Sequence, residues 1–478
     1  MIFYYFTSFS TTIMLYLRRT LVLWATLLGF FAGAQENTDN RYAEPLDQVL
    51  KNIETRYDVA IRYPDSLIKG KVLNYARWRF RPGVAETLDN VLAPFDLKAK
   101  KDGDKKFKIG SYEYYRWAVE DGWAELDRIA SQYKNVPEWE LRKKALKQCI
   151  LEKLRLAKLP AWPISKPVAT PLRKYNGYTV QNIALEILPG VWINGSLYKP
   201  AKYKGKIPVI LNPDGHWPQQ RYRADCQLRC AALAKMGAMA FSYDLFAWGE
   251  SLLQFRSEDH RRSLAMTIQA LGAIRILDYL LALKDADTSR VGITGGSGGG
   301  SHTVLMTAID DRIKVSAPVV SLSSYFYGGC PCESGMDIHS CAGGTDNVEI
   351  AAMAAPRPQL VVSDGGDWTD KMPEHDFPYL QKMYSWYGKK ADVQNVHLPA
   401  EKHDFGINKR TAVYRFMAQY LGLNIKAIED KQGQVDESGV TIEEEKKMYV
   451  FGDHGERLPA HAVKGFDNLV KVFEAAIK

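Results

Sequence analysis

The stretch Gly295-Gly296-Ser297-Gly298-Gly299 constrains the fold of this chain more than any other feature. It follows the short apolar run Val291–Thr294 and precedes a segment with helical character, so it places a serine in a tight turn between a strand and a helix. Side chains next to that serine would collide with the strand and helix backbones, which is why glycines are needed there. The N–H groups at the start of the helix can stabilise a developing negative charge. The pattern predicts a nucleophile at Ser297 and an oxyanion-binding N–H at Gly298, with an ordinary glycine-rich loop as the alternative.

Composition sets broad limits on what the protein can bind. With 478 residues, of which 46% are hydrophobic, the chain is long enough for two or three globular domains. The formal net charge of +8 is spread along the chain rather than gathered into a basic stripe. This distribution is not that of a nucleic-acid-binding protein, and no nucleic-acid partner is expected.

The first 34 residues have the three parts of a secretory signal peptide. Arg18 and Arg19 precede the apolar run Leu21–Phe31, which ends in the cleavage-site pattern Ala32-Gly33-Ala34. The apolar run is too short to span a bilayer comfortably, so no membrane span is expected once the signal is removed. We expect an exported protein that resides in the periplasm.

Pattern changes divide the rest of the chain into four parts. Residues 41–110 combine two amphipathic helical stretches with alternating strand-like runs, which indicates a small α+β domain. Residues 111–171 have the pattern of a helical connector, which ends in a linker that contains several prolines. Over 172–425, a hairpin leads into strands that alternate with helices, the pattern of a doubly wound, mostly parallel α/β sheet. Residues 426–478 are charged, weakly patterned and expected to form a C-terminal extension.

A serine hydroxyl is a weak nucleophile and needs a base, which in turn needs an orienting carboxylate. His403 follows the predicted strand Val393–Leu398 by a short loop, which is the position of a general base in this strand order. Asp367 follows the strand Leu360–Ser363 and is the expected acid, whereas Asp364 suits a turn. Glu333, after the preceding strand, remains an alternative acid.

The second oxyanion donor should come from the loop after strand Ile207–Asn212, where the N–H of His216 is the expected group. Export permits disulfides, and Cys330, Cys332 and Cys341 crowd one loop together with His339. A short disulfide that braces this loop is favoured over a zinc site, and no metal or other cofactor is predicted.

Residues 175–425 resemble the α/β-hydrolase carbohydrate esterases of polysaccharide-degrading gut bacteria, which include acetylxylan esterases and α/β-hydrolase pectin methylesterases. The matching motifs are Asp244-x-x-x-x-Gly249-Glu250-Ser251, Gly295–Ser301, Asn347-Val348-Glu349, Ala355-Pro356-Arg357-Pro358, Ser363–Trp368 and His403-x-Phe405-Gly406. The segment Pro45–Gly110 resembles the short N-terminal domain of secretins and TonB-dependent receptors, through Pro45-Leu46-x-x-Val49-Leu50 and Leu88-x-x-Val91-Leu92-Ala93-Pro94.

The resemblance implies a secreted serine esterase that acts on a plant cell-wall polysaccharide or oligosaccharide through an acyl-enzyme. The residues expected to contact sugar are Trp217, Arg221, Trp248 and Trp368. Basic residues at the expected mouth favour methyl-esterified pectic galacturonate, because neighbouring uronate carboxylates need cationic partners. Removal of O-acetyl groups from xylan or pectin is the alternative activity, and a non-catalytic envelope-binding protein is a further one.

Overall fold

The computed structural model describes residues 43–477 except 96, 112–115, 159–165 and 335–336, and it divides into two compact units, 1–113 and 114–478. The expected signal peptide at 1–34 lies outside the described residues. Among the residues that are described, no helix combines the length and hydropathy needed to cross a membrane.

The first unit is a small α+β fold. Its helices are α2 (Leu46–Tyr57), α3 (Asp65–Ile68) and α4 (Val84–Leu92), and its strands are β1 (Glu44–Pro45), β2 (Ala60–Arg62), β3 (Val72–Leu73), β4 (Leu97–Lys101) and β5 (Lys106–Ser111). The sheet order is β2-β5-β4, with β2 parallel and β4 antiparallel to β5, while β1 pairs with β3. Leu46, Val49, Leu50 and Ile53 share one face of α2 and are fully buried, because their spacing repeats once per helical turn.

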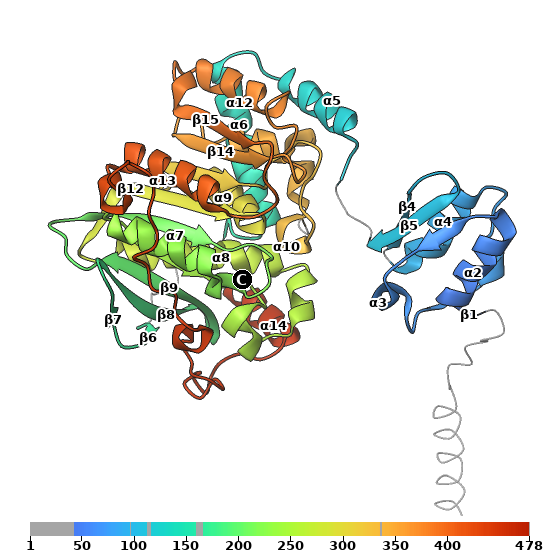
Figure 1. The fold of residues 1–478 in the computed structure, drawn as a ribbon, viewed down its shortest axis with the longest axis horizontal. Coiled ribbons are helices and arrows are strands. Elements are labelled where there is room, and N and C mark those ends of the chain that lie inside the picture. The colour runs from blue at the N-terminus through green and yellow to red at the C-terminus, as the bar shows by residue number, and fades with distance from the viewer. Residues whose placement is uncertain (1–42, 96, 112–115, 159–165, 335–336, 478) are drawn as a thin grey trace, which may run out of the picture. The chain divides into compact units, whose positions relative to one another are not determined.

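The second unit is built on a ten-stranded sheet with the order β15-β14-β13-β12-β10-β11-β9-β8-β6, and β7 also pairs with β8. The antiparallel part consists of β6 (Val168–Ala169), β7 (Arg173–Lys174), β8 (Tyr178–Leu188) and β9 (Val191–Pro200). The parallel part consists of β10 (Ile207–Pro213), β11 (Met239–Tyr243), β12 (Ala286–Gly296), β13 (Val315–Val319), β14 (Gln359–Asp364) and β15 (Val393–Leu398). In Figure 1 this sheet runs from the green hairpin strands to the orange β14 and β15.

Helices cover both faces of this sheet, as the near-continuous apolar strands require. One core cluster joins the sheet to α7 (Ala224–Lys235) and α13 (Ile407–Leu421). The other joins it to α8 (Ala265–Leu281), α9 (Gly298–Ile309), α11 (Asn347–Ala352) and α12 (Asp376–Ser385). The fold is therefore the doubly wound α/β-hydrolase type that the sequence predicts.

The segments on either side of the alternating strands and helices contribute to the same core. Helices α5 (Val119–Ala130) and α6 (Val136–Lys153) precede the sheet in sequence, and α14 (Phe466–Ala476) ends the chain. Leu126, Trp139 and Phe473 from these three helices are all buried in the larger cluster. The stretches 116–158 and 426–477 thus pack as integral parts of the second unit.

Candidate active site

Ser297 lies in the sharp turn between β12 and α9, at φ 54° and ψ −125°. A non-glycine residue with positive φ is strained, so the surrounding structure must hold it there. Its backbone N–H donates to the Val319 carbonyl at 3.0 Å. A Cβ on Gly295 would lie 2.5 Å from the Gly299 carbonyl oxygen, and one on Gly299 would lie 2.4 Å from the Pro213 carbonyl oxygen. The glycines are therefore required by close backbone approaches, and the turn presents the serine hydroxyl.

The turn brings Ser297 together with His403 and Asp367. His403 Nε2 lies 2.9 Å from Ser297 Oγ, and His403 Nδ1 lies 2.6 Å from Asp367 Oδ2. Because a carboxylate can only accept, Nδ1 carries the imidazole proton and leaves Nε2 free to take the serine proton. The other carboxylate oxygen of Asp367 accepts from both the N–H and the hydroxyl of Thr369, each at 2.6 Å. The arrangement has the geometry of a serine hydrolase triad.

Two tryptophans flank the imidazole. The ring centroids of Trp217 and Trp368 lie 5.5 Å and 4.7 Å from that of His403. Both side chains are half-buried, and Trp368 Nε1 donates to the Ser321 carbonyl at 3.1 Å, which fixes its ring. These contacts place both residues beside the reacting groups, where part of each ring remains open to a ligand.

The two segments expected to supply the oxyanion donors pack against each other. Gly298 is the first residue of α9, so its N–H has no partner within the helix. A Cβ on Gly298 would lie 2.6 Å from the His216 ring, and one on Gly215 would lie 2.5 Å from the Gly296 carbonyl oxygen. The loop after β10 therefore packs directly on the serine turn.

Glu333 does not contact His403. Its carboxylate accepts from Ser301 Oγ at 2.8 Å and lies 3.8 Å from His216 Nδ1. Burial removes the carboxylate from water and raises the pKa of Glu333, while the nearby His216 and Ser301 act in the opposite direction. The alternative acid assignment is wrong in this geometry, because His403 Nδ1 faces Asp367.

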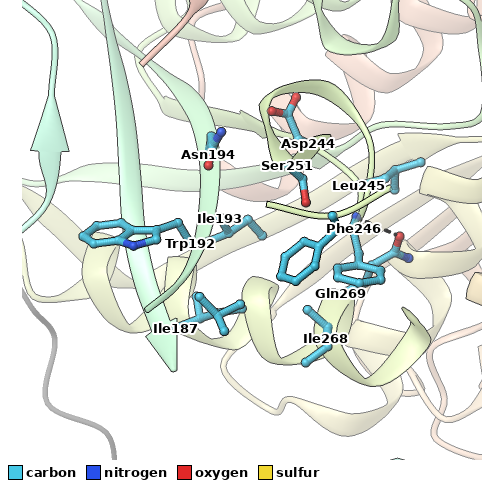
Figure 2. Close-up of a pocket in the computed structure, with 12 residues that line it drawn as sticks. Ile187, Trp192, Ile193, Asn194, Asp244, Leu245, Phe246, Ser251, Ile268 and Gln269 are labelled. Atoms are coloured by element: carbon cyan, nitrogen blue, oxygen red, sulfur yellow. Dashed lines mark hydrogen bonds between the residues drawn. The ribbon is translucent and has the colours of Figure 1, made fainter. Parts of the chain in front are cut away.

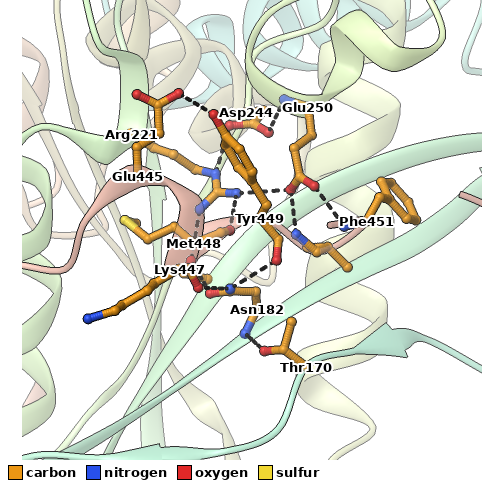
Figure 3. Close-up of polar contacts among 12 residues, drawn as sticks. Thr170, Asn182, Arg221, Asp244, Glu250, Glu445, Lys447, Met448, Tyr449 and Phe451 are labelled. Carbon is orange, nitrogen blue, oxygen red and sulfur yellow. Dashed lines mark hydrogen bonds and ion pairs between the residues drawn. The ribbon is translucent and has the colours of Figure 1, made fainter. Parts of the chain in front are cut away.

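Arg221 is fully buried, contrary to the prediction that it contacts sugar. Its side chain is 0% exposed and bonds Asp244 at 2.7 Å, Ser196 Oγ at 2.8 Å and the Met448 carbonyl at 3.1 Å. Glu250, 3.5 Å from the guanidinium, accepts from the N–H groups of Val450 and Phe451 (Figure 3). Arg221 thus ties the C-terminal segment to the loop after β11, and the motif Asp244…Gly249-Glu250 supplies that network.

Trp248 contacts His216 and His260 rather than a residue of the triad. Its ring centroid is 5.6 Å from that of His216 and 5.2 Å from that of His260, both edge-on. The predicted sugar contact by Trp248 therefore has less geometric support than those by Trp217 and Trp368. A separate, mostly apolar hollow lined by Ile187, Phe246, Ile268 and neighbours lies between the β8–β9 hairpin and α8, and no triad residue lines it (Figure 2).

The cysteines pair differently from the prediction. Cys341 forms a disulfide with Cys149 of α6, whereas Cys330 and Cys332 are free and buried. His339 Nε2 contacts Asn347 at 2.9 Å. A short disulfide within the loop is therefore wrong for Cys341, because its partner comes from a helix that is distant in sequence.

One basic residue near the site was not predicted. Arg116 forms a β-bridge with Phe326, and its guanidinium lies 5.3 Å from that ring. The Phe326 ring is in turn 4.3 Å from Trp368. No sequence periodicity reveals such a contact, because it joins the start of the connector to a loop far along the chain.

Comparison with known proteins places the chain in a family. No family model matches it, and no curated protein matches it. Among solved structures, methylesterase BT1017 is 49% identical over 92% of this chain and 98% of its own, with a TM-score of 0.77. A putative acetyl xylan esterase from Bacteroides fragilis is 15% identical over 67% of this chain and 88% of its own, with a TM-score of 0.44. A glucuronoyl esterase from Solibacter usitatus is 18% identical over 59% and 93%, with a TM-score of 0.43.

The identity to methylesterase BT1017 extends over nearly the whole of both chains, so it includes the sheet and the loops that carry the site. A sequence identity of 49% is far above the level at which two proteins share only a fold. This chain is a carboxylic ester hydrolase and belongs to the α/β-hydrolase carbohydrate esterases.

Proposed function

We propose that this esterase removes methyl groups from esterified uronates in pectin, through an acyl-enzyme on Ser297. The contact chain from Ser297 Oγ through His403 to Asp367 carries the proposal, because it is the arrangement that activates a serine hydroxyl. A methyl ester on a carbohydrate requires a sugar carboxyl group, which only uronic acids and related acidic sugars supply. The name of the 49% identical relative, a methylesterase, therefore favours a uronate substrate over an acetylated neutral sugar.

The reaction follows from the positions of these groups. Ser297 Oγ attacks the ester carbonyl carbon while His403 Nε2 takes the hydroxyl proton, and the N–H groups of Gly298 and His216 stabilise the oxyanion. Collapse of this intermediate breaks the bond to the methoxy group, which leaves as methanol with the proton from His403. Water then attacks the acyl-enzyme with His403 as base, releasing the uronate carboxylate and restoring Ser297. Asp367 stabilises the imidazolium in both halves of the cycle.

The flanking aromatic rings suit a sugar ligand. Trp217 and Trp368 both contact the His403 ring and are half-buried, so a pyranose ring that presents its ester to Ser297 can stack on an indole. Lys402, directly before His403, is exposed, and Arg116 lies on Phe326 beside Trp368. These cations supply the partners that neighbouring uronate carboxylates need. In this proposal, Lys402 and Arg116 serve as the cationic partners of substrate carboxylates, a role for which Arg221 is too deeply buried.

The test is a comparison of products. The purified protein is incubated with highly methylated homogalacturonan and, separately, with acetylated xylan, and methanol and acetate are measured. We expect methanol from the first substrate and little acetate from the second. Acetate without methanol would contradict the proposal and support the acetyl esterase alternative.

We also propose that the enzyme acts in the periplasm after export. The support is the sequence of residues 1–34, with its paired arginines, apolar run and Ala32-Gly33-Ala34 site. N-terminal sequencing of the protein from fractionated cells tests this: a mature chain that begins at Gln35 in the periplasmic fraction is expected, and an uncleaved cytoplasmic chain would contradict it.

A further inference from the structure

Four metal-ligating side chains from separate parts of the second unit meet beside the serine turn. His216 comes from the loop after β10 and His260 from the 3-10 helix Ser257–Arg261, while Cys332 lies in α10 (Pro331–Ser334) and Cys330 directly precedes that helix. One ligand atom from each of these four side chains lies within 4.8 Å of the ligand atoms of the other three. Among the described residues, this group of histidine and cysteine side chains is close enough together to hold a metal ion. We propose that this cluster binds a structural zinc ion with Cys₂His₂ coordination.

Hydrogen positions at the two imidazoles favour a cation between them. His260 Nδ1 lies 2.5 Å from the Phe246 carbonyl oxygen, which can only accept, so that nitrogen carries the proton. The lone pair of His260 Nε2 therefore points at His216 Nε2, 2.9 Å away. His216 Nε2 also lies 2.9 Å from Cys332 Sγ. A single proton on His216 Nε2 can serve only one of these contacts well, whereas a dication serves all of them at once.

The donor set and its surroundings suit zinc. His260, Cys330 and Cys332 are 4%, 7% and 4% exposed, and both cysteines are free thiols. Two thiolates and two neutral imidazoles neutralise a dication and form one of the common structural zinc sets. Bonds of about 2.0–2.3 Å place tetrahedral ligand atoms roughly 3.3–3.8 Å apart, so small side-chain movements convert the observed cluster into a coordination sphere.

Outer contacts complete the site in the way that zinc sites require. His260 Nδ1 donates to the Phe246 carbonyl, which fixes the orientation of that ring, and His216 Nδ1 lies 3.8 Å from the Glu333 carboxylate. The Trp248 indole makes edge-to-face contacts with both rings, with centroids 5.6 Å and 5.2 Å away. Because all four positions are taken by protein, no coordination site is left open for a substrate, and the role is structural.

The location gives this ion a consequence for catalysis, and this step rests on the proposed function. The imidazole of His216 lies against Gly298, where an added Cβ would approach it to 2.6 Å. A metal bond to His216 Nε2 anchors the loop that carries its backbone N–H. His216 is thus a positioning residue through its side chain, because the ion holds the oxyanion loop against the serine turn.

The direct test is metal content. The purified protein, dialysed against metal-free buffer and analysed by inductively coupled plasma mass spectrometry, should contain about one zinc per chain. Replacement by Co²⁺ should give the intense visible bands of a tetrahedral thiolate site. Cys332→Ser and His260→Ala should lose the metal, whereas Cys226→Ser, which removes a buried free thiol on α7, should keep it.

The alternative state is a bridge between Cys330 and Cys332 or two uncoordinated thiols. Alkylation under denaturing conditions followed by peptide mass spectrometry distinguishes these states in the unmodified protein, so the test does not depend on the variants folding. A protein without zinc after reconstitution, with either a Cys330–Cys332 disulfide or free thiols that bind no Co²⁺, would overturn the proposal.

Activity measurements separate this proposal from the proposed function. Removal of zinc by a chelator should lower kcat for methanol release about tenfold or more with a small change in KM, and added zinc should restore it. A zinc-containing protein that releases no methanol would refute the proposed function and leave the metal site standing. A protein that keeps its full rate of methanol release after its zinc has been removed would refute the positioning role of the ion and leave the proposed function standing.

Discussion

Replacement of Asp367 by asparagine should disable His403 without removing it. In the structure, one oxygen of Asp367 accepts from the N–H and the hydroxyl of Thr369, and the other faces His403 Nδ1. In Asp367→Asn, the N–H and the hydroxyl of Thr369 still need an acceptor, so the amide oxygen takes the place of the carboxylate oxygen that they contact. The amide NH₂ must then face His403 Nδ1 and donate to it, so the imidazole proton moves to Nε2. That nitrogen lies 2.9 Å from Ser297 Oγ and can no longer accept its proton.

The expected loss in kcat is about 10⁴-fold, the magnitude seen when a triad histidine is held in the wrong tautomer. This corresponds to about 5.5 kcal/mol of transition-state stabilisation, at 1.36 kcal/mol per factor of ten. Because the amide has nearly the same shape and keeps both Thr369 contacts, the melting temperature should change little.

The assay is initial-rate methanol release from methylated pectin, with thermal unfolding measured on the same samples. Asp370→Asn is the matched control, because that carboxylate accepts from the Tyr325 hydroxyl and does not touch His403. A folded Asp367→Asn protein that keeps a tenth or more of the wild-type kcat would refute the tautomer argument. A comparable loss in Glu333→Gln with normal Asp367→Asn activity would return the acid role to Glu333.

Three further changes test the structure around the site. Arg221→Met leaves Asp244 buried without its partner and should lower the free energy of unfolding by about 3–5 kcal/mol in denaturant titration; a raised KM with unchanged stability would instead restore Arg221 as a substrate contact. Cys149→Ser opens the disulfide to Cys341, which spans 192 residues, and should destabilise the protein by about 2–4 kcal/mol; equal stability of reduced and oxidised wild type would contradict this. Burial lowers the pKa of His302 to about 4 from its usual 6.5, so the neutral form is kept in the folded state. The contribution of His302 to the free energy of unfolding should therefore be fully present above about pH 6.5, fall as the pH drops below that value, and be lost below about pH 4, a change of about 3 kcal/mol. His302→Gln should flatten this slope, and an unchanged slope would show that another group causes it.

Much of the fold follows from the sequence because its signals are local. The run Val291–Thr294 followed by glycines and Ser297 predicts strand, turn and helix within a few residues, and β12 and α9 have that order. The extent of the second unit is harder to predict from the sequence. Helices α5, α6 and α14 join this unit through contacts between residues far apart along the chain, such as those of Phe473. Weak patterning of the last residues conceals that Val450 and Phe451 donate to a buried glutamate.

Some of the site residues can likewise be predicted from the sequence, whereas others depend on tertiary contacts. Ser297, Asp367 and His403 each follow a parallel strand, and the carboxyl ends of such strands meet at one edge of the sheet, so their meeting can be expected. Arg221 was predicted from charge alone, and charge does not reveal whether a guanidinium faces a ligand or, as here, a buried carboxylate. The Cys149–Cys341 bond and the grouping of His216 and His260 with two cysteines depend on tertiary contacts that no spacing rule encodes.

Methanol release by wild type and Ser297→Ala on methylated homogalacturonan tests the central claim most directly. The wild-type protein should release methanol, and the variant, folded to the same melting temperature, should lose at least about 10³-fold in kcat. Methanol release that survives in Ser297→Ala would contradict the assignment of the nucleophile and the mechanism built on it.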